Sequence, residues 1–519
     1  MLRRLSVVVC FSLAVSCASA PIKKIDTVDL AKADQLVADG CYDCLTDALA
    51  IYQRVGVGKA RPLVIQRIFE TDLLLGLRLK ELALSGGAQF DAARALVPEL
   101  SPAFPAAKYL EIANGVPADP NGGIPGADVA IAQRAVLSPL KAYKEFLAGG
   151  ASATLNDYLT ASLDCTVPYN GPPIRIDEIS RDPRQAMKPA PAPAPQKNNL
   201  MTYRRANCVP LDREALGKLM TDEPKWVEAG VFLGRVRSLR PAATEFRDSR
   251  VLLTAAEAKW PRSASVLYGL GTLNQTAGDC RAAVGYYDKT LREYGQHESA
   301  HLGRLMCLSY LTRHEEAIAE ASGMIATKIN VGEAYYWRAW NKRETNQLPA
   351  ARADSDIMKT LLFNGRVMTL AGQIEHDVDD LPVAEKDLTD AVRLGLGENC
   401  VAQWYWSLVQ LKKQAWPEAA DGFVKSMACY ELDRSKTVTD LEAMKKLQNV
   451  DEDWRNGQIA NFEEEIKDDD SQISASAFNA AVNFARAQNR DKALQYCDLA
   501  EKDPARAAQV AELRKLIVK

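Results

Sequence analysis

A short motif recurs at a nearly constant step along the C-terminal two thirds of this 519-residue chain. Each copy ends in an alanine, and the first five alanines are Ala283, Ala317, Ala351, Ala384 and Ala419. The steps between them are 34, 34, 33 and 35 residues, and a last copy ends at Ala493, 74 residues further on. A unit of this length cannot bury its apolar face alone, so neighbouring units must stack into a solenoid.

The spacing within one unit predicts two antiparallel helices. The repeated alanine falls where the second helix crosses the first most closely, and a second small residue twelve positions earlier allows the same approach on the first helix. Three units have it, as Gly271, Ala339 and Gly372. Prolines at 349, 382 and 417 fit the first turn of the second helix, where a missing N–H costs nothing. The 74-residue step leaves room for one divergent helical pair.

This pattern resembles the tetratricopeptide repeat, over about Trp226 to Lys519. The resemblance implies an all-α, helical-hairpin solenoid that binds other proteins or peptides and acts as a non-enzymatic scaffold or adaptor without a cofactor. Fold alone does not determine function, so the partner stays open.

The rest of the chain divides by composition. Residues 17–166 predict a degenerate, repeat-like helical domain, with a Pro- and Gly-rich loop at 101–127. Residues 167–204 are Pro-rich and predict an extended linker, and residues 205–519 form the solenoid. The net charge of −3 gives no reason to expect binding to nucleic acid.

The N-terminus predicts export. A basic start and a short apolar stretch are typical of a secretory signal peptide, which we place at residues 1–16. The segment Ala14-Val15-Ser16-Cys17 resembles a bacterial lipoprotein box, although Ala14 departs from its usual residue. The expected location is therefore the periplasm, or the outer membrane if lipidated Cys17 attaches the chain to it.

Nine cysteines follow Cys17, and an oxidising compartment would tend to pair them. Cys400 opens a first helix and Cys429 closes the second helix of the same unit, so we predict a disulfide between them. Cys280 with Cys307 is a second candidate pair, and Cys165 with Cys208 a third. Cys41 and Cys44 predict either a disulfide at a helix start or two reduced, packed thiols.

One motif suggests an alternative function. His297-Glu298-Ser299-Ala300-His301 has the spacing of a zinc peptidase helix, and Glu320 lies where a third ligand would stand. The repeat register, however, places His297 in the turn before the helix that begins at Glu298. We therefore expect no metal here, and we keep a peptidase built on His297, His301 and Glu320 as the alternative.

The binding surface follows from the stacking. First helices line the concave side of such a solenoid, so their side chains that are not needed for packing should face the groove. The register places eight residues there: Tyr268, Leu302, Tyr310, Tyr336, Trp340, Arg343, Trp404 and Leu408. Exposed aromatic residues with an arginine are typical of binding hot spots. The other interpretation is that several of them pack against the N-terminal domain or the Pro-rich linker.

Overall fold

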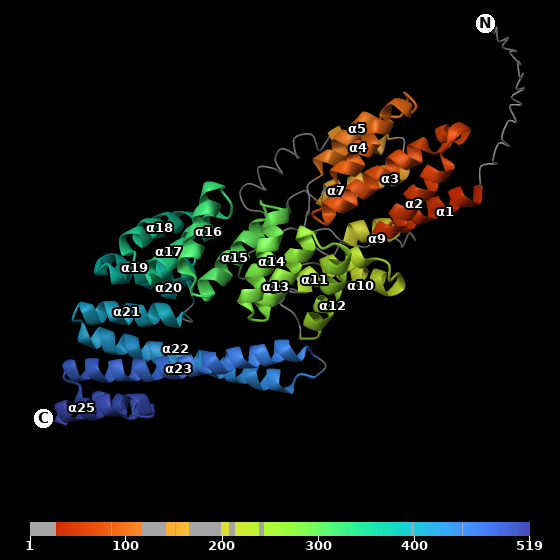
Figure 1. Cartoon of the computed structure of the whole chain (residues 1–519). Coiled ribbons are helices and arrows are strands. Elements are labelled where there is room, and N and C mark those ends of the chain that lie inside the picture. Colours follow the sequence, from red (N-terminus) through yellow and green to blue (C-terminus); the bar gives the residue numbers. More distant parts are fainter. Residues whose placement is uncertain are drawn as a thin grey trace, which may run out of the picture.

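The computed structural model describes residues 27–84, 86–116, 142–150, 152–165, 199–206, 213–237, 243–395, 399–448 and 450–518, and their regular structure is helical (Figure 1). The predicted signal peptide with Cys17, most of the Pro-rich linker and Cys208 lie outside these residues. No described helix combines the length and the apolar character needed to cross a membrane.

The repeat units are helical hairpins, as predicted. Each first helix packs against its second helix and against the second helix before it. The helices are α13 (Ala264–Thr276) with α14 (Cys280–Glu293), α15 (Glu298–Tyr310) with α16 (His314–Ala326), α17 (Val331–Glu344) with α18 (Leu348–Leu361), and α19 (Gly365–Asp377) with α20 (Leu381–Leu394). The next first helix is α21 (Cys400–Lys412).

The small residues lie where the register places them. All six repeated alanines, including Ala493, are fully buried. A methyl group added at Gly271 would come within 2.7 Å of the Tyr287 ring, so only glycine permits this close approach of α13 and α14. Pro349, Pro382 and Pro417 occupy the first turn of α18, α20 and α22 (Trp416–Lys446).

The turn within each hairpin repeats as well. The residue five positions before each alanine has a left-handed backbone, with φ between 55° and 83°. These residues are Gly278, Thr312, Asn346, Asp379, Gln414 and Gln488. Only one of them is glycine, and Asn346 and Asp379 belong to types that adopt this conformation more readily than most. At Thr312, Gln414 and Gln488, helix packing imposes the turn on residues that do not favour it.

The 74-residue step differs from the prediction. Its described residues contain no extra helical pair; instead α22 has 31 residues and α23 (Glu452–Arg486) has 35, against 13 or 14 in the preceding hairpins. The C-terminal half of α23 is the first helix of the last hairpin, whose second helix is α24 (Arg490–Ala500). The short helix η3 (Pro504–Arg506) and α25 (Ala507–Val518) end the fold.

The tip of the long α22–α23 pair contacts the beginning of the solenoid. Trp454 is buried against Leu273 of α13, and the Gln458 amide donates a hydrogen bond of 3.1 Å to the Thr276 carbonyl. Gly457 lies against the Ala277 carbonyl, where a Cβ atom would be 3.1 Å from the oxygen. The pair therefore forms a strap between hairpins about 180 residues apart in the sequence.

The N-terminal helices pack around their own core. They are α1 (Thr27–Asp39), α2 (Tyr42–Val55), η1 (Gly58–Ala60), α3 (Arg61–Glu81), α4 (Gly87–Leu96), η2 (Val97–Glu99), α5 (Ala106–Gly115) and α7 (Ala153–Cys165). The predicted loop at 101–127 is wrong in part, because α5 buries Tyr109, Leu110 and Ile112. The last residues of the predicted linker are also helical, as α9 (Asn199–Ala206) buries Leu200 in the same core.

A buried charge joins this core to the solenoid through α10 (Arg213–Asp222), α11 (Val227–Arg237) and α12 (Ala243–Lys259). Arg78 of α3 is fully buried and lies 2.6 Å from the carboxylate of Glu228 on α11 and 3.0 Å from that of Glu81. Its guanidinium stacks 4.1 Å from the centre of the Tyr203 ring and 5.0 Å from that of Trp226. One arginine thus connects three segments that are far apart in the sequence.

Candidate functional site

The first helices of consecutive hairpins lie next to one another. α13 contacts α15, α15 contacts α17, α17 contacts α19, and α19 contacts α21. We call their common outward surface, continued by the C-terminal half of α23, the first-helix face. It is the surface that the sequence predicts to bind a partner.

The predicted residues on this face are mostly covered by neighbouring helices. Tyr310 is 59 % exposed, whereas Tyr336 is 9 % exposed and counts as buried. The ring of Tyr336 lies under the guanidinium of Arg366 from the next hairpin, 4.1 Å from its centre. Tyr268 and Leu302 are half-buried, and the centre of the Tyr268 ring lies 4.5 Å from that of His297, with the two rings tilted. The prediction that Tyr336 is exposed was therefore wrong, because Arg366 of the next hairpin covers its ring.

The two tryptophans contribute to packing. Trp340 contacts the rings of Trp337 and His314, with centroid separations of 5.9 and 5.7 Å. Trp404 meets Phe423 of α22 at 5.0 Å, and Leu408 packs against the same cluster. Alanine at both tryptophans would therefore destabilise the fold, contrary to the sequence-based expectation that these side chains are dispensable for it.

A polar network crosses three first helices. Arg343 of α17 donates to the Asp377 carboxylate of α19 at 2.7 Å and to the Tyr405 hydroxyl of α21 at 2.8 Å. Burial raises the pKa of Asp377, but hydrogen bonds from His376 and Arg343 and the charge of Arg343 outweigh it, so that the pKa is lowered. Arg343 thus lies on the predicted face, where it holds neighbouring hairpins together.

One opening on the first-helix face was not predicted. A cavity of about 600 Å³ lies between the end of α23 and α25. The register could have revealed it, because Phe478 and Val482 in its wall occupy the positions of Trp404 and Leu408, 74 residues earlier. The predicted set ends at Leu408.

The zinc alternative does not have the required geometry. His297 lies before α15 and caps it, with Nδ1 accepting the Ala300 N–H at 3.3 Å. Both ring nitrogens of His301 are engaged, Nδ1 with Glu320 at 2.5 Å and Nε2 with the Gly295 carbonyl at 3.0 Å. Burial lowers the pKa of His301, but the hydrogen bonds to these two acceptors outweigh it, so that the pKa is raised. Neither ring nitrogen of His301 is therefore free to bind a metal in this arrangement.

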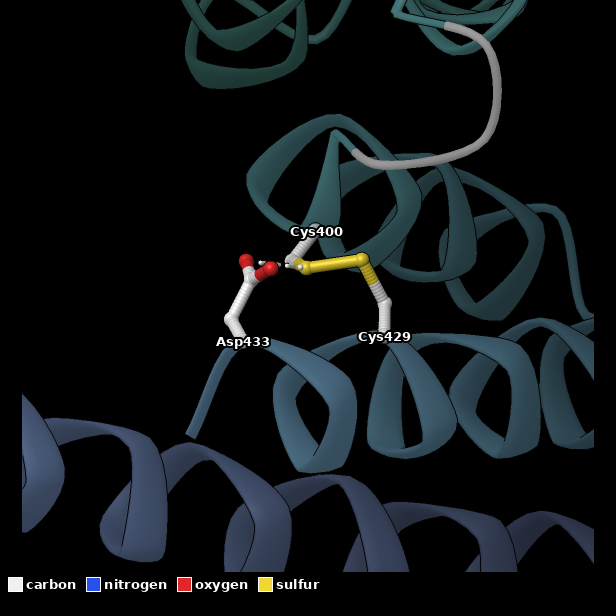
Figure 2. A group of neighbouring side chains, drawn as sticks. All are labelled: Cys400, Cys429 and Asp433. Carbon is white, nitrogen blue, oxygen red and sulfur yellow. Dashed lines mark hydrogen bonds between the residues drawn. A yellow bond between two sulfur atoms is a disulfide. The ribbon is translucent and has the colours of Figure 1, made fainter. Parts of the chain in front are cut away.

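Glu320 is also in use, since its second oxygen lies 2.5 Å from Arg304. Among the described residues, the group whose atoms lie near enough to one another to hold a metal is a different one, Cys400, Cys429 and Asp433 (Figure 2).

In that group the sulfur atoms are joined to each other. The structure has a disulfide between Cys400 and Cys429, with a Cα–Cα distance of 5.4 Å, and another between Cys280 and Cys307, at 5.0 Å. These are the two pairs that helix geometry predicts. Cys41 and Cys44 form a third bridge, which decides between the two alternatives left open for them, whereas Cys497 is a buried free thiol. Cys165 with Cys208 lies outside the described residues.

The hairpin step, the small residues at the helix crossings and the repeated left-handed turn define an α-helical solenoid of the tetratricopeptide-repeat type. No protein-family model and no curated protein matches the sequence.

Several solved structures of low identity resemble the chain. Cut9 in the APC/C hetero-tetramer Cut9–Hcn1 is 11 % identical, with 94 % of this chain and 92 % of that chain covered and a TM-score of 0.43. MamA from Desulfovibrio magneticus RS-1 is 18 % identical, over 33 % of this chain and 96 % of its own, with a TM-score of 0.30. YrrB, a repeat protein with an unusual peptide-binding site, is 14 % identical over 51 % and 97 %, with a TM-score of 0.26. Likeness at this level does not identify what this chain binds.

Proposed function

We propose that this protein is a non-enzymatic scaffold of the cell envelope that binds a segment of another protein on the first-helix face. A solenoid offers an extended surface built from equivalent positions of successive hairpins, which suits recognition of a peptide or a helix. The engagement of His297, His301 and Glu320 with their neighbours removes the support for a peptidase.

One observation supports this proposal most. On the last hairpin, Phe478 and Val482, which correspond to Trp404 and Leu408, line an open cavity of about 600 Å³. Pockets that bind ligands commonly have volumes of about 300–1,000 Å³ and mostly apolar walls. The first-helix face therefore combines a rigid, packed part with an accessible one.

Site-specific photo-crosslinking would test the choice of face. A benzophenone amino acid is placed at Tyr310 or Val401, which are 59 % and 40 % exposed on first helices. The matched controls are Ile357, which is 40 % exposed on the second helix α18, and Phe363, which is 62 % exposed just after that helix. We expect one shared adduct at Tyr310 and Val401 that the controls lack. The same adducts at all four sites, or adducts at the controls alone, would refute the assignment.

The location in the envelope rests on the signal-like N-terminus and is supported by the three disulfides, since such bridges persist in oxidising compartments. Lipid attachment at Cys17 is tested by metabolic labelling with a fatty acid in the wild type and in Cys17→Ser. Label retained by the variant would exclude this anchor.

A further inference from the structure

The cavity on the last hairpin has a wall of both apolar and polar side chains. Its walls come from the C-terminal half of α23, from the turn before α24 and from α25. The apolar lining residues are Phe478, Val482, Ala485, Leu513, Leu516 and Ile517. Leu516 is 69 % exposed, so the wall continues onto the surface.

The edge of the cavity has a positive charge that the described residues do not neutralise. Arg486 and Arg490 both line it, and neither forms an ion pair with a carboxylate of a described residue. Arg486 lies over the ring of Trp416, 4.7 Å from its centre, which holds the guanidinium in place. The one lining carboxylate, Glu512, is 2.6 Å from Lys515. The cavity therefore favours a ligand with negative charge beside apolar groups.

The position of the cavity connects it with the rest of the face. Phe478 is equivalent to Trp404, Tyr336, Leu302 and Tyr268 in the earlier hairpins. A segment that runs along the first-helix face would therefore reach the cavity at the C-terminal end.

We propose that this cavity binds a partner segment in which one or two large apolar side chains stand next to aspartate or glutamate. This inference rests on the proposed function and adds the chemistry of the partner to it. The apolar side chains would enter between α23 and α25, where their burial drives association. The carboxylates would face Arg486 and Arg490, whose planar donor groups match carboxylate geometry. The volume accommodates a few side chains and excludes a folded domain.

The test begins with a phage-displayed library of random peptides selected on the full-length, oxidised protein. Selected peptides are synthesised with a fluorescent label, and their binding is measured by fluorescence anisotropy. We expect the selected sequences to be enriched in Asp or Glu beside Leu, Phe or Trp. Failure to select any peptide, or selection of basic sequences, would overturn the proposal.

Two variants then locate the binding. Arg486→Glu/Arg490→Glu reverses the charge at the edge, and Leu516→Glu changes an exposed part of the wall, so neither should affect folding, which circular dichroism checks. Each should weaken binding about tenfold or more, because charge-assisted hydrogen bonds are lost or a carboxylate repels the peptide. The matched control Arg281→Glu/Arg292→Glu makes the same charge change on exposed residues of α14 and should leave the affinity within about twofold.

The two proposals can fail separately. Binding that is unaffected by both cavity variants but lost in Tyr310→Glu/Val401→Glu would refute the cavity and keep the first-helix face as the binding surface. Binding lost only in the control would refute both.

Discussion

Replacing Trp454 by alanine should release the tip of the strap from the start of the solenoid. Hairpins of a solenoid normally contact only their neighbours, so a solenoid can bend and change its curvature at low energetic cost. Here Trp454, Gly457 and Gln458, which share one face of α23, contact the turn after α13. Arg250 of α12 adds a longer contact of 3.5 Å with Asp451 at the start of α23.

The magnitude follows from the burial of the tryptophan. Trp454 is only 5 % exposed, and a buried tryptophan removes roughly 200 Å² from water, which contributes about 5 kcal/mol at ~25 cal/mol per Å². Its apolar neighbours divide between the strap itself, through Met444 and Leu447, and α13, through Leu273 and Ala277. About half of that energy, roughly 2 kcal/mol, therefore belongs to docking, which corresponds to about a 30-fold shift toward the released strap.

Hydrogen exchange measured by mass spectrometry reports this release directly. Amides of residues 444–461 and of the turn at 276–279 should exchange faster in Trp454→Ala, while those of α15 to α20 keep their protection. Trp416→Ala, at the other end of α22, is the matched control and should leave the tip protected. If the tip and the turn exchange as slowly in Trp454→Ala as in the wild type, the docking energy does not come from this side chain.

Three further predictions concern stability. Arg78→Met should cost about 3–5 kcal/mol of unfolding free energy, because it leaves the buried Glu228 carboxylate without its partner. Chemical denaturation should show a partial recovery of stability in Arg78→Met/Glu228→Gln, and an equal loss in both variants would argue against the pair. Loss of the Cys400–Cys429 bridge, which closes a separation of 29 residues, should cost about 2–4 kcal/mol in the double serine variant, and an unchanged midpoint would show that the bridge adds no stability. The pKa of His301 is raised in the folded state. Its contribution to stability should therefore be complete below the ordinary histidine pKa of about 6.5 and be lost as the pH rises through the higher folded value. His301→Gln should remove this pH dependence of the unfolding free energy, and identical pH profiles of wild type and variant would refute the prediction.

The repeat pattern predicted the hairpins well because it records close packing. An alanine that must be buried at each helix crossing leaves a regular mark in the sequence, as does a proline that only a first turn accepts. The long helices left no such mark. The additional residues of α22 and α23 have the same helical periodicity as the rest of these helices. Periodicity alone does not distinguish one pair of long helices from two pairs of short ones.

The candidate site was predictable only in part, because exposure depends on the neighbour. The register placed Tyr336 on the first-helix face, but Arg366 of the next hairpin covers it. The disulfides were easier to predict, since residues at the same level of two antiparallel helices lie side by side. This holds for Cys429 although α22 continues beyond it, and the prediction that Cys429 closes this helix was wrong. The turn residues Thr312, Gln414 and Gln488 could not be predicted to be left-handed, because their side chains do not favour that conformation.

The buried arginine on α3 has a consequence for the order in which the chain can fold. Its counter-charge, Glu228, is made 150 residues after Arg78, and Trp226, which stacks on the guanidinium, comes only slightly earlier. While the chain is being synthesised, Glu81 on the same helix gives this guanidinium a counter-charge, but its burial against Glu228 and Trp226 waits until most of the following 150 residues have emerged. The N-terminal core and the start of the solenoid therefore complete this contact late in synthesis.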